Sequence, residues 1–220
     1  MHTPQHPYSP HFAEHYWSGG AAEKHHVFLQ GNTLPQRFAA LKPGETFHVA
    51  ELGFGTGLTF LLTAHLFETT APPNAALHYT SYEKFPLTLA QLQPIHAALP
   101  PHLHQLAQHL RNSLTGHTQT LTFGRATLCL TVADAATAVS SQETPADAWF
   151  LDGFSPARNP DMWQPQLLQH IYNLTAPGGT AATYSAASAV REGLRAAGFH
   201  VTRSAGFPPK KHMLVAEKPA

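Results

Sequence analysis

Apolar and polar positions along this 220-residue chain follow two recurring patterns. Short apolar runs, rich in β-branched and aromatic residues, predict strands, whereas longer segments with apolar residues every three or four positions predict helices. Strands are predicted at 46–52, 77–83, twice within 120–134, and at 147–153 and 179–185, with a final hairpin of 200–206 and 212–218. Helices are predicted at 57–68, 86–109 with breaks at its prolines, 160–174 and 187–197.

Alternation of strands and helices from residue 45 onward predicts one α/β domain with a doubly wound, mostly parallel sheet. The closing hairpin predicts an antiparallel C-terminal edge strand. Residues 1–44 do not follow this alternation, so we predict an irregular segment there that folds over a ligand pocket as a lid. Within it, residues 26–32 match a short strand that ends in a turn. The expected division is therefore 1–44 for the lid and 45–220 for the core domain.

Composition limits the class of protein further. Apolar residues make up 43% of the chain, which excludes disorder, whereas charged residues make up only 12% and the formal net charge is zero. A nucleic-acid partner would therefore have to be held by a local basic patch. The sequence has no basic head followed by an apolar core and no apolar run of about 20 residues, so we expect a cytoplasmic protein without a membrane partner.

Cysteine and histidine usage argues against a metal. Cys129 is the only cysteine, so an internal disulfide and CxxC-type zinc sites are excluded. Several of the 17 histidines form close pairs, but none of these pairs has an obvious third ligand. We therefore expect no metal.

A glycine-rich loop, "ELGFGTGL", follows the first core strand and opens the first core helix. Gly53, Gly55 and Gly57 allow a tight turn and a close approach to a ligand at the helix N-terminus. The third glycine comes one residue earlier than in the dinucleotide fingerprint G-x-G-x-x-G. Glu51, at the end of the strand, suits a cationic amino-acid ligand better than a pyrophosphate. The loop therefore points to S-adenosylmethionine, although a purely structural glycine-rich turn remains an alternative.

Two further acids follow the next strands. Glu83 ends the second core strand, where an acid can accept hydrogen bonds from both ribose hydroxyls. Asp134 follows the third, where a carboxylate can accept one from an adenine amino group, although a helix N-cap is the alternative there. Phe54 in the loop and Lys84 beside Glu83 complete the candidate donor site.

The segment "FLDGFSPARNPDMW" carries the candidate chemistry for the acceptor. Asp152 ends the fourth core strand, next to the expected methyl donor. A carboxylate there can accept an N–H from an amine, orient its lone pair and stabilise the ammonium that develops. Phe154 can stack on a planar base. The alternative for Asp152 is a turn residue paired with Gly153.

Four segments, "ELGFGTGL", "YEKFPLT", "AWFLDGFSPARNPDMW" and "APGGTAATYSAASAVREGLRAAGF", together with "HVFLQGNTLPQRF", resemble one known family. It is the methyltransferase half of the tRNA 5-methylaminomethyl-2-thiouridine biosynthesis enzymes, and the resemblance covers residues 8–217. It implies a class I, Rossmann-like methyltransferase fold and methylation of the aminomethyl nitrogen of the tRNA wobble uridine. It also implies that Glu51 and the glycines form the donor loop. Glu83 would hold the ribose, Asp134 would lie at the adenine and Asp152 at the reaction centre.

The resemblance also implies partners. The tRNA anticodon region would be the substrate, and an FAD-dependent oxidoreductase, separate or fused, would make the aminomethyl group. This sequence resembles a stand-alone form or one half of the larger protein. The candidate tRNA contacts are Arg158, Arg203, Lys210 and Lys211. The lysine pair equally fits a solvated hairpin turn.

Three other functions remain open from the sequence. The first is a methyltransferase for another amine, which the low charge favours. The second is a nicotinamide-dependent oxidoreductase, which the glycine spacing disfavours. The third is a non-catalytic nucleotide-binding module, which would have no use for Asp152 beside Phe154.

Overall fold

The computed structural model describes residues 7–17 and 19–220. In this part of the chain, an eight-stranded central sheet has the order β5-β6-β4-β3-β7-β8-β10-β9. The strands β6, β4, β3, β7 and β8 are parallel, whereas β5 at one edge and β10 and β9 at the other are antiparallel to their neighbours. The strands of the sheet are β3 (Thr46–Leu52), β4 (Ala76–Glu83), β5 (Gln119–Phe123), β6 (Ala126–Val132), β7 (Ala146–Leu151), β8 (Thr175–Thr183), β9 (His200–Ala205) and β10 (His212–Glu217).

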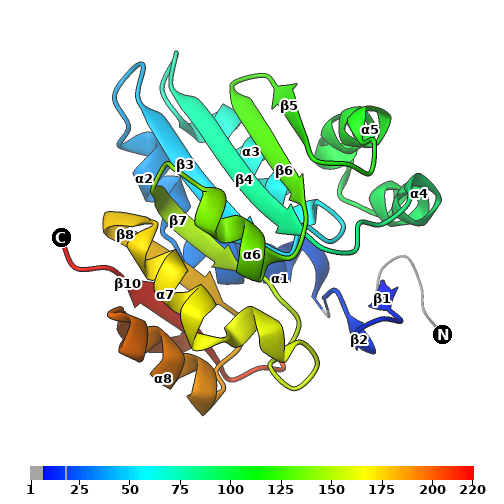
Figure 1. Ribbon diagram of the computed structural model, residues 1–220. Helices are drawn as coiled ribbons and strands as arrows, with labels where there is room; N and C mark the ends of the chain where they lie inside the picture. The colour runs from blue at the N-terminus through cyan, green and yellow to red at the C-terminus, as the bar shows by residue number, and fades with distance from the viewer. Residues whose placement is uncertain (1–6, 18) are drawn as a thin grey trace.

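Helices cover both faces of the sheet, with α6, α7 and α8 in front and α1, α2 and α3 behind (Figure 1). This confirms the doubly wound α/β fold, with antiparallel strands at both edges rather than only at the C-terminal one. The helices are α1 (Gly20–Lys24), η1 (His25–Gln30), α2 (Leu34–Ala39), α3 (Leu58–Thr70), α4 (Leu89–Ala97), η2 (Pro101–Leu103), α5 (His104–Ser113), α6 (Ala135–Ala138), η3 (Val139–Ser141), η4 (Pro160–Trp163), α7 (Pro165–Asn173) and α8 (Ser188–Ala197).

Alternating residues of the central strands feed two separate cores. On β3, Phe47 and Val49 join the core behind the sheet, whereas Ala50 and Leu52 join the core in front of it. Because successive side chains of a strand point to opposite faces, a strand buried on both sides is a nearly continuous apolar run. This is why β7 has an unbroken apolar run over 148–151, whereas β3 buries His48 and Glu51 among its apolar residues.

The N-terminal segment differs from the expectation of an irregular lid with a strand at 26–32. Residues 20–39 contain α1, η1 and α2, and η1 is a π-helix over His25–Gln30. The side chains of Val27, Phe28 and Leu29 are almost fully buried. The Phe28 ring lies 5.4 Å from that of Phe150 on β7. The β-branched and aromatic residues suggested a strand, but burial against the back of the sheet selects a helix here. Before these helices, β1 (Tyr8–Ser9) and β2 (Glu14–His15) form a small antiparallel hairpin that is separate from the central sheet.

A second difference concerns the helix predicted over 160–174. The structure has a 3₁₀ turn, η4, and then α7, with Gln164 in an extended conformation between them. Pro165 follows Gln164, and a proline disfavours the helical conformation in the residue before it. The break separates the segment that borders the cleft described below from the helix that packs on the sheet.

The order of the strands determines where a ligand can bind. From β3 the chain moves outward through β4 and β6, and then returns to place β7 on the other side of β3. In open α/β sheets, ligands bind at the carboxyl ends of the strands where the order reverses. In Figure 1 the β1–β2 hairpin lies beyond this end of the sheet.

Candidate functional site

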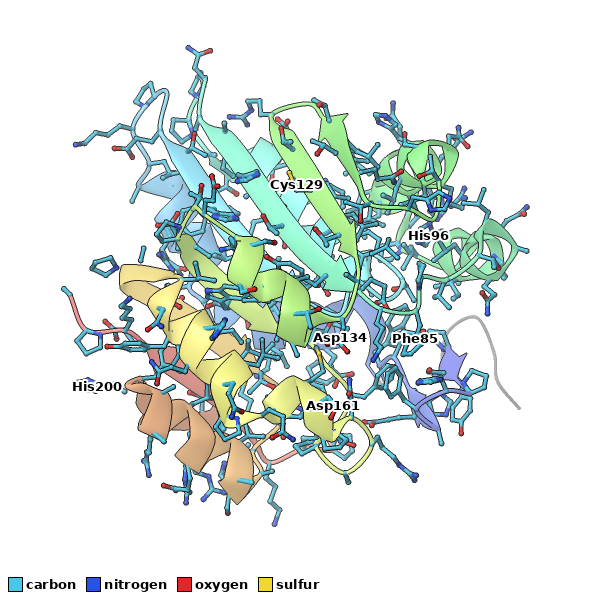
Figure 2. The ribbon with its side chains drawn as sticks, viewed as in Figure 1. Phe85, His96, Cys129, Asp134, Asp161 and His200 are labelled. Atoms are coloured by element: carbon cyan, nitrogen blue, oxygen red, sulfur yellow. The ribbon has the colours of Figure 1, made fainter. Side chains whose placement is uncertain are left out.

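A cleft of about 560 Å³ lies at the carboxyl ends of the central strands. Its volume is in the range of sites for small ligands. Its lining comes from the loops after β3, β4, β6 and β7, and it is covered by the β1–β2 hairpin and by α1. In Figure 2 the labelled Phe85, Asp134 and Asp161, which all belong to the lining, lie around this end of the sheet. Of the sequence-predicted donor residues, Gly53, Phe54, Gly55, Glu83, Lys84, Asp134 and Asp152 line the cleft.

The glycine loop takes the conformation that its sequence predicts. Gly53, Gly55 and Gly57 all have positive φ, at +87°, +52° and +74°. A Cβ added at Gly53 would lie 2.8 Å from the carbonyl oxygen of Asp152, so this glycine lets the loop pass close to the strand end that carries Asp152. Gly57 precedes the first residue of α3 and packs beneath the loop against Phe54 and Leu110.

Glu83 joins the glycine loop to the end of β4. One carboxylate oxygen accepts a hydrogen bond from the Gly55 N–H at 2.8 Å, and the other accepts one from the Phe85 N–H at 2.7 Å. Burial raises the pKa of Glu83, whereas hydrogen bonds from backbone N–H groups oppose this shift. Each carboxylate oxygen can accept a second hydrogen bond, so Glu83 can still receive two hydroxyl donors.

Glu51 lies beneath the cleft, with a residue exposure of only 1%. Its carboxyl group accepts a hydrogen bond from the Ser81 hydroxyl at 2.8 Å. Burial, together with the nearby Asp152 charge, raises its pKa well above the ordinary value. Glu51 is not among the residues that line the cleft, so we infer that it supports the floor of the cleft. The expected contact between Glu51 and the cationic end of a ligand stays a prediction.

Asp134 is the helix N-cap that the sequence offered as an alternative, and it also lines the cleft. It caps α6 by accepting a hydrogen bond from the Ala136 N–H at 2.9 Å. The Lys84 ammonium lies 2.7 Å from its carboxylate and lowers the pKa of Asp134, mainly through this hydrogen bond. The pair places a carboxylate and a partly exposed cation at one end of the cleft, and the contact with adenine stays a prediction.

Asp152 forms a buried ion pair that the sequence gave no reason to expect. The Lys24 ammonium lies 2.6 Å from each of the two carboxylate oxygens, and the two side chains are 8% and 9% exposed. The Thr59 hydroxyl is 3.3 Å from one of these oxygens. Burial raises the pKa of Asp152 to about 6, although the Lys24 charge lowers it. A carboxylate with such a pKa can exchange a proton near neutral pH.

Phe154, which the sequence predicts to stack on a planar base, lines the cleft and is half-buried in an aromatic cluster. The ring of Phe12 stacks on it at 4.4 Å, and the ring of Tyr16 meets it edge-on at 5.3 Å. Glu14 fixes the same loop by accepting hydrogen bonds from the N–H and hydroxyl of Ser155 at 3.0 and 2.7 Å. The β1–β2 hairpin therefore covers the acceptor side of the cleft.

The four candidate basic residues do not all lie at the cleft. Arg158 and Lys210 belong to its lining, whereas Arg203 lies on the edge strand β9 and Lys211 in the turn before β10. The Lys210 ammonium is 3.3 Å from Glu23 and 3.8 Å from the centre of the Tyr184 ring. Lys210 thus links the C-terminal hairpin to the cleft.

Four site residues were missed from the sequence: Glu14, Lys24, His96 and Tyr184. His96 on α4 is buried, and its Nε2 donates to the Thr56 carbonyl in the glycine loop at 2.7 Å. Burial lowers the pKa of His96, consistent with a neutral ring. Local sequence patterns carry little trace of these residues. The one available signal was that Glu23 and Lys24 are adjacent charges in a chain that has few of them.

Comparison with known proteins decides the family. A family described as S-adenosyl-L-methionine-dependent methyltransferase matches residues 98–219, more than half of the chain. The chain belongs to this family. Its methyl donor is therefore S-adenosylmethionine, as the glycine spacing indicated.

Similar proteins extend this result. The chain is 45% identical over 215 residues to a protein of Stutzerimonas stutzeri, the "tRNA 5-methylaminomethyl-2-thiouridine biosynthesis bifunctional protein MnmC", covering 94% of this chain and 32% of the relative. The protein of the same name from Chromobacterium violaceum is 45% identical over 213 residues, with the same coverage. The chain thus spans about a third of the length of the curated relatives it matches. A solved structure of MNMC2 from Aquifex aeolicus superposes with a TM-score of 0.79 over 95% of this chain and 67% of the other, at 23% identity, which supports the fold.

The residues of the cleft fit this donor. Glu83, which accepts a hydrogen bond from Gly55 of the glycine loop, can still accept hydrogen bonds from two hydroxyls. Asp134 offers a second carboxylate in the lining of the same cleft. Residues 7–17 and 19–220 contain no helix long and apolar enough to cross a membrane. Among the same residues, no three His, Cys, Asp or Glu side chains are grouped so as to hold a metal ion.

Proposed function

We propose that this chain methylates the aminomethyl nitrogen of 5-aminomethyl-(2-thio)uridine at the tRNA wobble position. The observation that carries the proposal is the position of Asp152, a buried carboxylate in the cleft directly beside the glycine loop. The names of the relatives support the choice of acceptor. S-adenosylmethionine supplies an electrophilic methyl group in this reaction.

Each side of the cleft has its own task in the proposal. Gly53, Gly55, Glu83 and Asp134 hold the donor, with Phe54 and Lys84 beside them. Asp152 accepts an N–H of the acceptor amine, keeps its lone pair directed at the methyl group and stabilises the positive charge that develops on nitrogen. Phe154, within the aromatic cluster, packs against the base that carries the amine.

The substrate and partners follow from the same reasoning. Arg158 and Lys210 at the rim of the cleft contact phosphates of the anticodon loop, and Arg203 and Lys211 extend this contact along the C-terminal hairpin. An oxidoreductase that uses FAD, either fused or separate, provides the aminomethyl group. Residues 45–220 form the methyltransferase domain, and the β1–β2 hairpin with α1 covers its cleft.

The deciding experiment supplies labelled S-adenosylmethionine and two tRNA pools. One pool carries 5-aminomethyluridine at the wobble position, and the other carries unmodified uridine there. We expect label only in the first pool. Calorimetry measures donor binding in parallel. If neither pool is labelled although the donor binds, the chain is still a methyltransferase but the proposed acceptor is wrong.

A second acceptor class is favoured by one observation. The chain has a formal net charge of zero. Of the four candidate basic residues, Arg158 and Lys210 line the cleft, and Lys210 is paired with Glu23. A small or protein-borne primary amine would need no phosphate contacts. Methylation of such an amine at a rate independent of salt would favour this alternative over tRNA, because phosphate binding weakens steeply with salt.

A further inference from the structure

Lys24 is a buried cation that the proposed transfer does not use. It belongs to α1, and it contacts Asp152, which is 128 residues away in sequence and follows β7. Both side chains line the cleft, so the pair borders the space in which an acceptor would sit. Desolvating two charges is costly, and a buried pair is weak evidence for a stabilising role. Its position at the reacting carboxylate calls for a chemical explanation.

An amine acceptor presents a problem that this pair can solve. A primary alkyl amine has an ordinary pKa near 10, so at neutral pH nearly all of it is protonated and has no free lone pair. A lone carboxylate in a dry site would make this worse, because an opposite charge favours the charged form of its neighbour. A carboxylate already paired with an ammonium has little net charge. It can still accept an N–H and stabilise the partial positive charge of the transition state, but it favours a fully charged ammonium less than a lone carboxylate does.

The groups behind the pair are one carboxyl and two hydroxyls. Glu51 is buried there, its carboxyl accepts a hydrogen bond from Ser81, and burial with the Asp152 charge raises its pKa well above the ordinary value. Tyr79 is also fully buried, and burial raises its pKa well above the ordinary value. Thr59 contributes a hydroxyl 3.3 Å from Asp152. Lys24 is thus the cation in direct contact with Asp152.

At the rim of the cleft, one acid is paired with a cation and another is bound by neutral donors. Glu23, next to Lys24, is paired with Lys210 at 3.3 Å and accepts the Gly19 N–H at 2.9 Å. Glu14 accepts hydrogen bonds from the N–H and hydroxyl of Ser155 and from the Tyr184 hydroxyl. Burial raises the pKa of Tyr184, so its hydroxyl is neutral. Lys24 differs from these groups because it contacts both carboxylate oxygens of Asp152, where the amine would bind.

We propose that Lys24, through its ion pair with Asp152, makes the cleft bind the acceptor amine in its neutral, nucleophilic form. This rests on the proposed function. On binding, the acceptor ammonium loses one proton to the solvent, and its N–H then donates to Asp152 while its lone pair stays free. Lys24 is a positioning residue in this scheme, because it acts through Asp152.

Proton release on binding tests the proposal directly. An anticodon stem-loop with 5-aminomethyluridine is titrated into the wild-type protein loaded with S-adenosylhomocysteine, which fills the donor site without reaction. Calorimetry in buffers of different ionisation enthalpy gives the number of protons released. The same stem-loop with a hydroxymethyl group is the control, because it cannot lose this proton. If the pKa of the bound amine falls by about three units from 10, to near neutral, roughly 0.9 proton is released at pH 8.5.

The outcomes separate this proposal from the proposed function. A difference of about 0.2 proton or less between the two stem-loops at pH 8.5, corresponding to a pKa shift of one unit or less, overturns the inference even if the stem-loop is methylated. A stem-loop that neither binds nor is methylated instead contradicts the proposed function. When the stem-loop both binds and is methylated, the number of protons that the wild-type protein releases decides whether the amine binds in its neutral form.

Variants then test Lys24 itself. Lys24→Met removes the charge and keeps the length, so we expect it to abolish the extra proton release and to move the acidic limb of the kcat profile up by about one pH unit or more. Lys24→Arg keeps the charge and should retain both properties. Lys24→Gln replaces the methionine variant if circular dichroism shows that the latter is unfolded. An unchanged pH profile and proton release in the neutral variant would overturn the role of Lys24.

Discussion

Two ion pairs in this protein join distant segments, but their surroundings differ. Lys24 and Asp152 are about 8% and 9% exposed and border the cleft. Arg125 and Glu68, at the opposite end of the strands, are 27% and 38% exposed. The Arg125 guanidinium also donates to the carbonyl oxygens of four residues at the end of α3, namely Phe67, Glu68, Ala71 and Pro72.

The difference shows how the fold divides its few charges between stability and chemistry. Arg125 adds donors to carbonyls at the helix end, where the carbonyl oxygens of Phe67 and Pro72 also accept backbone N–H groups, so its charge is used within the protein. Asp152 instead has a pKa of about 6 because burial outweighs the effect of Lys24. The Arg125–Glu68 pair stabilises the end of α3, whereas the Lys24–Asp152 pair keeps a buried carboxylate at the cleft despite the cost of desolvating it.

The largest expected effect is on catalysis at the cleft pair. Asp152→Asn should lower single-turnover methyl transfer to the aminomethyl acceptor by roughly 10²–10⁴-fold, because the amide cannot take a proton or stabilise positive charge equally well. Glu68→Gln, at the other pair, is the matched control and should leave the rate unchanged. Donor affinity, measured by calorimetry, should stay within a few fold in both variants. A rate of Asp152→Asn within tenfold of wild type would remove its catalytic role.

The next effect concerns pH and stability. Asp152 has a folded-state pKa of about 6 against an ordinary value of 3.8, so between these pH values the folded protein holds more protons than the unfolded chain. Stability through this group is therefore fully present below about pH 4 and falls by about 3 kcal/mol as pH rises to 7. Urea denaturation of wild type and Asp152→Asn across this range should give a flatter dependence for the variant. Parallel curves would show that the carboxyl has an ordinary pKa.

At the other pair, Arg125→Ala should lower the free energy of unfolding by about 1–3 kcal/mol, because the carbonyls at the end of α3 lose their donors. Arg191→Ala provides a comparison, since Arg191 pairs only with its neighbour Glu192 on the surface of α8. Its loss should change the free energy of unfolding by less than about 0.5 kcal/mol. Urea denaturation measures both. Equal losses would mean that the carbonyl contacts of Arg125 add nothing.

The smallest expected effect comes from neutralising the whole cleft pair. Lys24→Met alone leaves a buried unpaired charge and should cost about 3–5 kcal/mol, whereas Lys24→Met with Asp152→Asn should lose less than about 1 kcal/mol. The double variant Arg125→Ala with Glu68→Gln should not recover free energy of unfolding relative to Arg125→Ala, because the carbonyls at the end of α3 still lack the donors of Arg125. Denaturation of the two double variants distinguishes these cases. If Lys24→Met with Asp152→Asn is as unstable as Lys24→Met alone, the ion pair is required for the stability of the fold.

Much of the fold was predictable because local patterns determine it. The apolar runs of β3 and β7 and the glycines between β3 and α3 specify buried parallel strands and a ligand loop without reference to the rest of the chain. Glu83, Asp134 and Asp152 could be predicted to lie together because the carboxyl ends of parallel strands meet at one edge.

The remaining features depend on contacts between distant residues. Lys24 meets Asp152 across 128 positions, and no spacing rule relates them. The residues His25–Gln30 have a strand-like composition, and only packing against the sheet makes them helical. The raised pKa of Glu51 could not be predicted either, because it depends on the depth at which β3 buries the side chain.

The contact between Lys210 and Glu23 has a consequence for how the protein is made. These residues are 187 positions apart, and both line the cleft. A ribosome adding about 5–20 residues per second needs roughly 10–40 s to pass from one to the other. Once residue 152 has been added, the growing polypeptide contains the glycine loop and the acids of the cleft, but for about 58 further residues it still lacks the lysine that pairs with Glu23. The finished cleft is thus a late product of translation, formed when the C-terminal hairpin adds to the sheet.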